Sequence, residues 1–332
     1  MDKFTLGIIA FPILFSMLAI RMPIGLAMLI VGCSGTILIA GWLPILSQVK
    51  TSAWHLFSNY SLSVIPLFLL MGNFAGKAGM SEALFKFTGA CLGHRKGGVA
   101  MAAIGACAGF GAICGSSLAT AATMGKVALP ELRRLGYSGA LSTGTLAAGG
   151  TLGILIPPSI MLVVMGPIME IPVIDLFAAA ILPGILLASL YAGYTTIRCM
   201  INPKLGPVIP EDMRAASMKD VWIEFFLGLV PPAALVFAAL GSILFGFATP
   251  TEAAGCGAMG ALLLSLAYKK LTFSKLQEAL VKTLEITALI MVLVAASNFF
   301  GAVFARLGTP TLLTEFLLSL EMNKYLILAM IM

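Results

Sequence analysis

The chain has 332 residues, of which 60% are hydrophobic and only 10% are charged, with a formal net charge of +6. A soluble domain carries about 25% charged residues because its surface must be hydrated, so this composition excludes an ordinary soluble protein. The basic excess does not indicate nucleic-acid binding, because the Lys and Arg residues lie in short breaks between apolar segments and not on one face. We predict an all-α, polytopic membrane protein.

Long uncharged stretches follow one another along the chain, and a helix crosses a bilayer with about 20 apolar residues. The first stretch has no small-residue cleavage site after it, so it is expected to be a retained helix and not a removed signal peptide. The stretches predict membrane elements at Phe4–Ile20, Pro23–Trp42, Val64–Gly76, Ser138–Met165, Ile174–Ile197, Trp222–Phe245, Thr251–Tyr268 and Glu285–Ala305.

The basic residues predict the orientation, because Lys and Arg concentrate in cytoplasmic loops. If Arg21 lies inside and the elements then alternate across the membrane, most basic residues lie in the cytoplasm. The residues that remain outside are Lys3, Lys50, Arg306 and Lys324. This predicts a multi-pass protein of the bacterial inner membrane with a periplasmic N-terminus.

Residues 97–131 are predicted to form a re-entrant helical hairpin. The segment is preceded by the basic triplet at residues 94–96 and followed by Arg133 and Arg134, so both flanks favour the cytoplasm. Its middle, residues 105–117, is rich in glycine, which costs about 1 kcal/mol per position inside a helix. The alternative is one ordinary glycine-rich spanning helix.

Weak similarity between the two parts of the chain, at an offset of about 225 residues, predicts two inverted repeats, a frequent construction of secondary transporters. The predicted first repeat is 1–201, followed by a cytoplasmic linker at 202–221 and a second repeat at 222–332. A complete second copy would extend further, so we expect this repeat to be incomplete by roughly 90 residues, including a second hairpin.

A second interruption is predicted within residues 138–166, where a glycine-rich stretch leads to Pro157, Pro158 and Ser159. Proline inside a helix removes a hydrogen-bond donor and costs about 3 kcal/mol, so two in succession predict a broken helix. The freed carbonyls, with the hydroxyls of Thr151 and Ser159, are hard oxygen ligands. The alternative is a kink that serves packing alone.

The hairpin tip, Gly115 to Thr120, would expose the carbonyl end of one helix and the amide end of the next. Carbonyl ends attract a cation, whereas helix N-termini attract an anion such as a carboxylate. Ser116 and Ser117 are also good N-cap residues, which is the structural alternative. A third segment, Thr249 to Glu252, fits ordinary helix-start chemistry, although a role for Glu252 stays open.

Neither the tip nor the break contains Asp, Glu or His, the residues of intramembrane proton relays, and this favours sodium over protons as the coupling ion. The six Cys residues form no metal-binding pattern and no phosphate-binding GxxxxGK[ST] loop is present. No catalytic pair at membrane depth is apparent, so we predict that the protein is not an enzyme and needs no cofactor besides the coupling ion.

Four motifs together resemble the large membrane subunit of tripartite ATP-independent periplasmic (TRAP) transporters, over essentially the whole chain. The motifs are PLFLLMGN from Pro66, GSSLAT from Gly115, GILIPPS from Gly153 and ATPTEAA from Ala248. The resemblance implies two inverted repeats, each with a hairpin and a broken helix, that work as a sodium-driven elevator. It also implies a small four-helix membrane subunit and a periplasmic substrate-binding protein as partners, and an organic acid such as a C4-dicarboxylate, a sialic acid or another sugar acid as substrate.

The resemblance implies residue roles at the tip and the break. It implies a sodium site that includes Gly115, Ser117, Thr120, Gly149, Thr151, Gly153, Pro157 and Ser159. It implies substrate contacts at Ser116, Ser117, Thr120 and Pro158. An alternative reading of the chain is a divalent-anion/sodium symporter that works without a binding protein.

Overall fold

The computed structural model describes residues 3–208, 222–309, 311, 314–315 and 326, and within these residues the chain is helical and contains no β-strand. The all-α prediction is therefore confirmed. The chain divides into two compact units, one formed by residues 1–59 with 288–332 and the other by residues 60–287.

The first unit contains α1 (Lys3–Ala19), α2 (Ile24–Ala40), α3 (Leu43–Phe57) and the last part of α15 (Phe273–Leu307). Its core joins α1 to α2 through buried Ala10, Leu14, Ala27 and Val31, against which Phe300 and Phe304 of α15 pack. The helix α3 was not among the predicted membrane elements, because polar residues interrupt its apolar pattern.

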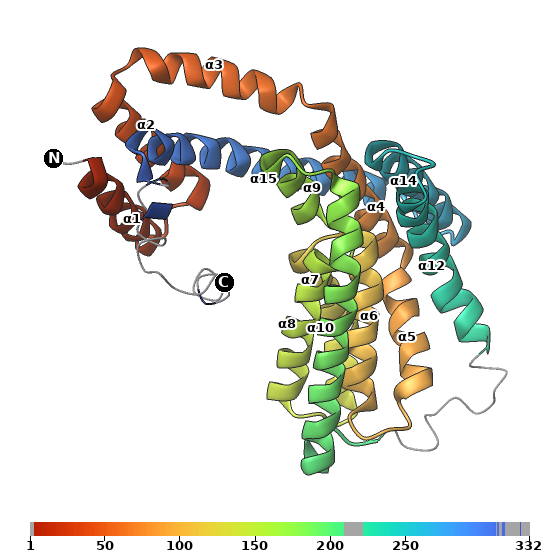
Figure 1. The fold of residues 1–332 in the computed structure, drawn as a ribbon. Coiled ribbons are helices and arrows are strands. Elements are labelled where there is room, and N and C mark those ends of the chain that lie inside the picture. The colour runs from red at the N-terminus through yellow and green to blue at the C-terminus, as the bar shows by residue number, and fades with distance from the viewer. Residues whose placement is uncertain (1–2, 209–221, 310, 312–313, 316–325, 327–332) are drawn as a thin grey trace. The chain divides into compact units, whose positions relative to one another are not determined.

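The second unit contains the remaining helices, drawn from orange to blue in Figure 1. They are η1 (Tyr60–Ser63), α4 (Val64–Ala78), α5 (Met80–Leu92), α6 (Gly98–Cys114), α7 (Ser117–Arg134), α8 (Gly139–Leu155), α9 (Ile160–Met169), α10 (Val173–Ile201), η2 (Pro203–Leu205), η4 (Phe225–Leu229), α12 (Val230–Val236), η5 (Phe237–Gly241), α13 (Ser242–Leu244), α14 (Pro250–Ala267) and the first part of α15. The elements from η4 to α13 belong to one helical stretch, Trp222–Leu244.

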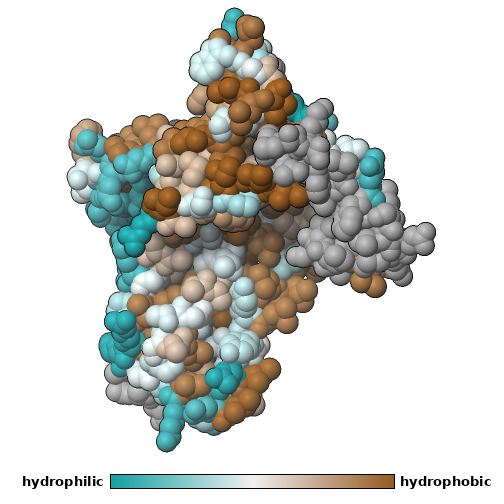
Figure 2. Space-filling model, turned by 90° about the vertical axis from the view of Figure 1, so that its left-hand side faces the viewer, coloured by the Kyte–Doolittle hydropathy of each residue, from teal (hydrophilic) through white to brown (hydrophobic). Residues whose placement is uncertain are grey.

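Among the described residues, four helices are long and apolar enough to cross a membrane, and the bent pair α8 and α9 forms a fifth candidate. The four are Tyr60–Ala78, Val173–Ile201, Trp222–Leu244 and Phe273–Leu307. Large apolar side chains are widely exposed, as on α10, where Leu182 is 75% exposed and Leu190 is 59% exposed. Figure 2 shows broad hydrophobic areas on the face that it presents. A hydrocarbon environment accounts for this surface, since soluble proteins rarely expose large apolar patches.

The helices α6 and α7 form a helical hairpin, and its re-entrant position in the membrane stays a prediction. The Val99 amide, at the start of α6, donates to the Tyr137 hydroxyl just after α7, over 3.2 Å. Gly97 and Ser138 at the same end donate to the carbonyls of Gly206 and Leu205, both over 3.0 Å. The start of α6 and the end of α7 therefore lie together, and the chain turns back between the two helices.

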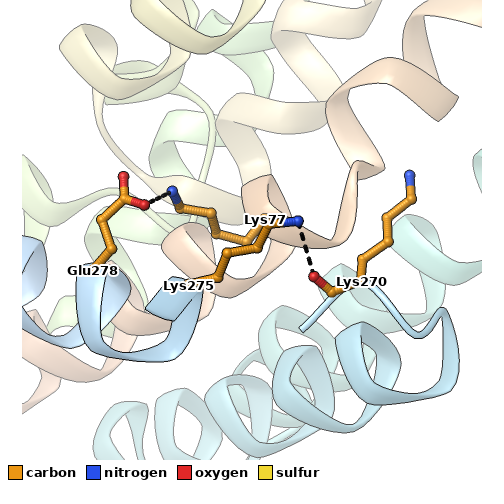
Figure 3. A network of polar contacts seen from close by, with 4 residues as sticks. All are labelled: Lys77, Lys270, Lys275 and Glu278. Atoms are coloured by element: carbon orange, nitrogen blue, oxygen red, sulfur yellow. Dashed lines mark hydrogen bonds and ion pairs between the residues drawn. The ribbon is translucent and has the colours of Figure 1, made fainter. Parts of the chain in front are cut away.

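The helix α15 begins at Phe273, earlier than the predicted Glu285, because its charged first turns find partners on the second unit. Lys77 of α4 forms an ion pair with Glu278 over 2.5 Å, and Lys275 Nζ donates to the Lys270 carbonyl over 3.0 Å (Figure 3). One turn earlier on α4, Asn73 Nδ2 donates to the Thr283 hydroxyl over 2.9 Å. The contacts of Lys77 and Asn73 therefore hold the start of α15 against α4, whereas Lys275 contacts the segment that precedes α15.

Parts of the predicted organisation fall beyond the described residues. Residues 209–221 of the predicted linker and most of residues 310–332, with Lys324, lie outside them. The inverted repeats and the boundaries at 201 and 222 therefore stay predictions.

Candidate functional site

The hairpin tip is formed by the end of α6 and the start of α7. Gly115 is buried and adopts φ +61°, a left-handed conformation that favours glycine, and its amide donates to the Gly111 carbonyl over 2.8 Å. Ser116 is extended and caps α7, because its hydroxyl accepts from the Ala119 amide over 3.4 Å. The structural role expected for Ser116 is thus present, and the last carbonyls of α6 end beside the first amides of α7.

The break between α8 and α9 follows from the two prolines, and the helices are bent by 41° there. Pro157 and Pro158 carry no N–H, so the carbonyls of Gly153 and Ile154 lose the donors that a continuous helix would supply. The buried Ser159 hydroxyl replaces one of them by donating to the Ile154 carbonyl over 2.6 Å. The Gly153 carbonyl has no such donor from its own helix.

The tip and the break are in direct contact. The Ile160 amide, at the start of α9, donates to the Gly115 carbonyl over 3.2 Å. A Cβ added to Gly153 would lie 2.7 Å from the Thr120 hydroxyl and 2.8 Å from the Ser116 carbonyl, so only glycine allows this approach. A Cβ added to Gly115 would similarly lie 2.7 Å from the Pro158 carbonyl. Residues far apart in the sequence thus bring backbone oxygens to one place.

Hydroxyl groups line the same contact. Thr120 is fully buried, its hydroxyl donates to the Ser116 carbonyl over 2.8 Å, and it lies 3.0 Å from Cys114 Sγ. Ser116 and Ser117 are half-buried at the start of α7. A hydroxyl that donates its proton keeps two lone pairs, so these groups can still accept from a ligand or coordinate a cation.

Two residues expected at the site have other neighbours. Thr151 is exposed, and its hydroxyl donates to the Ala148 carbonyl over 2.7 Å and lies 3.2 Å from the Tyr191 hydroxyl of α10. Gly149 faces α6 farther from the tip, where an added Cβ would lie 2.9 Å from Cys107 Sγ. The structure therefore gathers the predicted residues at 115–120 and 153–159, and it does not bring the Thr151 side chain to them.

Sequence reasoning missed two glycines that make the contact possible. An added Cβ at Gly111 would lie 2.8 Å from the Gly153 Cα, and one at Gly72 of α4 would lie 2.5 Å from the Cys114 Cβ. Each glycine lets another helix approach its backbone. Gly72 lies in the PLFLLMGN motif and Gly111 in the glycine-rich stretch 105–117, but neither pattern shows which helix approaches the glycine.

The arrangement offers two kinds of binding group close together. The carbonyl end of α6, the Gly153 carbonyl and the Thr120 hydroxyl are hard oxygen atoms suited to a small cation. The first amides of α7 and α9 carry the positive ends of two helix dipoles and suit an anion. Among the described residues, no group of three or more His, Cys, Asp or Glu could hold a metal ion, so the site has no conventional transition-metal character.

Glu252 lies at the start of α14 and forms a capping box with Thr249. The Thr249 amide donates to Glu252 Oε2 over 2.8 Å, and the Glu252 amide donates to the Thr249 hydroxyl over 3.4 Å. The ordinary helix-start interpretation of this motif is therefore confirmed.

Comparison with known proteins identifies the family. Residues 11–332 match the family described as the tripartite ATP-independent periplasmic transporter, DctM component. The chain belongs to this family. The family is one of transporter components, which agrees with the exposed apolar helices and with the prediction of a multi-pass inner-membrane protein.

Several similar proteins are named after different substrates. A C4-dicarboxylate TRAP transporter large permease protein from Pseudomonas aeruginosa is 33% identical over 90% of this chain and 69% of its own length. An isethionate TRAP transporter permease protein, DctMQ, from Oleidesulfovibrio alaskensis is 31% identical over 96% of this chain and 50% of its own length. A sialic acid TRAP transporter large permease protein from Vibrio cholerae is 31% identical over 82% of this chain and 62% of its own length. The chain thus spans about half to two thirds of these relatives.

Proposed function

We propose that this DctM-family chain is the large membrane subunit of a sodium-coupled carrier that takes up a small organic acid. The observation that supports the proposal is the contact between the hairpin tip and the helix break, where the Ile160 amide reaches the Gly115 carbonyl. Interrupted helices that present backbone groups to a solute are typical of secondary transporters.

Sodium fits the donor set of this contact. In the proposal the cation is held by hydroxyl and carbonyl oxygens from Ser117, Thr120, Gly153 and the residues beside them, with no carboxylate in contact. Intramembrane proton relays use Asp, Glu or His side chains, and residues 115–120 and 153–159 contain none of these. Sodium is thus the co-transported ion of this proposal, and the exposed Thr151 hydroxyl, which faces Tyr191, is left outside its site.

The organic acid is proposed to bind beside the cation. Half-buried Ser116 and Ser117 lie at the start of α7, and Pro158 precedes α9. The positive ends of both helix dipoles at these starts are suited to a carboxylate or sulfonate. A bound cation would lower the cost of bringing this negative charge to membrane depth. The acid groups in the relatives' substrates, a C4-dicarboxylate, isethionate and sialic acid, support this class of substrate.

The proposed partner proteins and the proposed elevator movement of the second unit are based on membership of the family. We propose that the chain works with a small membrane subunit and a periplasmic substrate-binding protein, since the family is tripartite and the Oleidesulfovibrio relative is named DctMQ. In this proposal the N-terminus is periplasmic and the second unit carries the solute across the membrane as an elevator. Family membership favours this carrier over a divalent-anion/sodium symporter without a binding protein.

Sodium-dependent uptake by the assembled transporter tests the proposal. Thr120→Val keeps the side-chain shape but removes a buried hydroxyl, so we expect the sodium concentration for half-maximal uptake to rise about tenfold, the equivalent of one lost ligand of about 1.4 kcal/mol. Thr151→Val is the matched control, because it removes a threonine hydroxyl from α8 that faces Tyr191. Equal sodium dependence in wild type and Thr120→Val, or uptake that needs no sodium, would contradict the proposed site.

A further inference from the structure

A pocket of about 290 Å³ lies in the second unit, away from the tip and the break, between α8, α10 and the first half of α6. Its lining residues include Ser138 and Gly144 of the α8 region, Tyr194 and Arg198 of α10, and Ile104 of α6. The sequence analysis assigned no role to this place, and the proposed carrier mechanism does not use it.

The pocket has a cationic residue, Arg198, for which the described residues supply no counter-ion. Arg198 is exposed, and the ion pairs found within the described chain join Lys77 to Glu278, Lys86 to Glu82 and Arg134 to Glu131, so they leave Arg198 unpaired. The lining residues, all within the described part of the chain, include no acidic side chain. This part of the pocket therefore suits a group with negative charge.

The rest of the pocket combines hydroxyls with an apolar wall. Tyr194, one turn before Arg198 on α10, supplies a hydroxyl, and Ser138 and Tyr191 add polar groups elsewhere in the lining. Ile104, Leu141 and Ala148 supply apolar surface. A charged head with hydrogen-bond acceptors, joined to an apolar tail, matches this division. A small soluble anion would fill only the polar part.

The position along α10 corresponds to the edge of a bilayer. The helix has 29 residues and is about 43 Å long, which exceeds the hydrocarbon thickness of roughly 30 Å, so its last turns reach the headgroup level. The exposed face leading to Arg198 is apolar, with Leu190 59% and Ile197 58% exposed. The pocket is thus continuous with a surface that lipid tails would cover.

We propose that this pocket binds an anionic phospholipid, with its phosphate at Arg198 and Tyr194, and with one acyl chain against Ile104, Leu141 and Ala148. Tyr and Arg at a helix end are common interfacial anchors by themselves. The pocket beside them is what indicates a bound lipid, as in basic pockets between transmembrane helices. The proposal rests on the chain spanning a bilayer and not on carrier activity.

The test uses the purified, delipidated full chain in detergent. Added phosphatidylglycerol is expected to raise the Tm by several degrees and to remain bound in native mass spectrometry, whereas phosphatidylcholine is expected to have little effect. Arg198→Gln should weaken phosphatidylglycerol binding about fivefold or more, the effect of one basic side chain near an anionic lipid. Arg133→Gln is the matched control, because it removes a charge from the same end of the unit but not from the pocket lining.

A second variant tests the pocket itself without removing a charge. Gly144 lines the pocket, and a Cβ added there meets no other atom within 4 Å, so Gly144→Leu should fold and obstruct the apolar part. Loss of phosphatidylglycerol binding in both Arg198→Gln and Gly144→Leu, but not in Arg133→Gln, would support the proposal. Unchanged lipid binding in Gly144→Leu, equal losses in Arg198→Gln and Arg133→Gln, or the same stabilisation by glycerol phosphate alone would overturn it.

Discussion

Two contacts of the second unit differ in what holds them together. The tip and the break meet through backbone atoms, at a distance that only Gly153 and Gly115 allow. The contact of α4 with the start of α15 uses long side chains, with Lys77 28% and Glu278 59% exposed (Figure 3). Backbone contacts are rigid and tolerate no added atom, whereas exposed ion pairs adjust and are screened by solvent. The proposed solute site therefore lies at the less adaptable of these two contacts.

The largest effect is expected from a single methyl group at the tip–break contact. Gly153→Ala would place its Cβ within 2.8 Å of the Ser116 carbonyl and should lower stability by about 1–3 kcal/mol while reducing uptake by an order of magnitude or more. The same change at Gly144, on the same helix with open space around it, should be neutral or stabilising. Thermal unfolding in detergent and uptake by the assembled transporter measure both effects. Equal Tm values and equal uptake rates for Gly153→Ala and Gly144→Ala would contradict the view that the tip–break contact tolerates no added atom.

An intermediate effect is expected at Asn73, which donates to the buried Thr283 hydroxyl. Asn73→Leu removes this hydrogen bond but leaves Thr283 donating to the Ala279 carbonyl, so we expect a loss of about 1 kcal/mol. Thr283→Val removes the same hydrogen bond from the other side and should cost a similar amount. A double-mutant cycle based on thermal unfolding should then show that the two losses are not additive; full additivity would mean that the hydrogen bond contributes nothing.

The smallest effect is expected from the ion pair of Lys77 with Glu278. Both side chains are partly exposed, so the coupling energy from a cycle of Lys77→Met and Glu278→Gln should be below about 1 kcal/mol and should decrease with added salt. A coupling energy above about 2 kcal/mol would contradict the distinction between an adaptable, exposed ion pair and the rigid backbone contact at Gly153 and Gly115.

The parts of the site that could be predicted from the sequence are those set by the covalent structure of the residues themselves. Two successive prolines remove amide donors in any context, so the break at Pro157 and Pro158 could be predicted, as could the glycine-rich turn at Gly115. The direction of the Thr151 side chain could not, because it depends on the packing of α8 against α10. Gly72 and Gly111 were missed for a similar reason, since a close approach is a property of two helices and not of one sequence.

The same distinction applies to the fold. Hydrophobic stretches predicted the positions of most membrane helices, because each must cover its own length of bilayer. The start of α15 at Phe273 was missed, because the charges at Lys275 and Glu278 resemble a loop until their partners, Lys270 before α15 and Lys77 on α4, are known. Local sequence thus predicts which segments are helical more reliably than which helices meet.

The most direct test of the proposed cation site is the Tm of the purified chain in sodium compared with potassium or choline at equal ionic strength. We predict that sodium raises the Tm of wild type and of Thr151→Val, because binding to the folded state stabilises it, and that Thr120→Val requires about tenfold more sodium for the same shift. Identical unfolding curves in sodium and choline, or an identical sodium response of Thr120→Val and wild type, would contradict the assignment of a sodium ion to the tip–break contact.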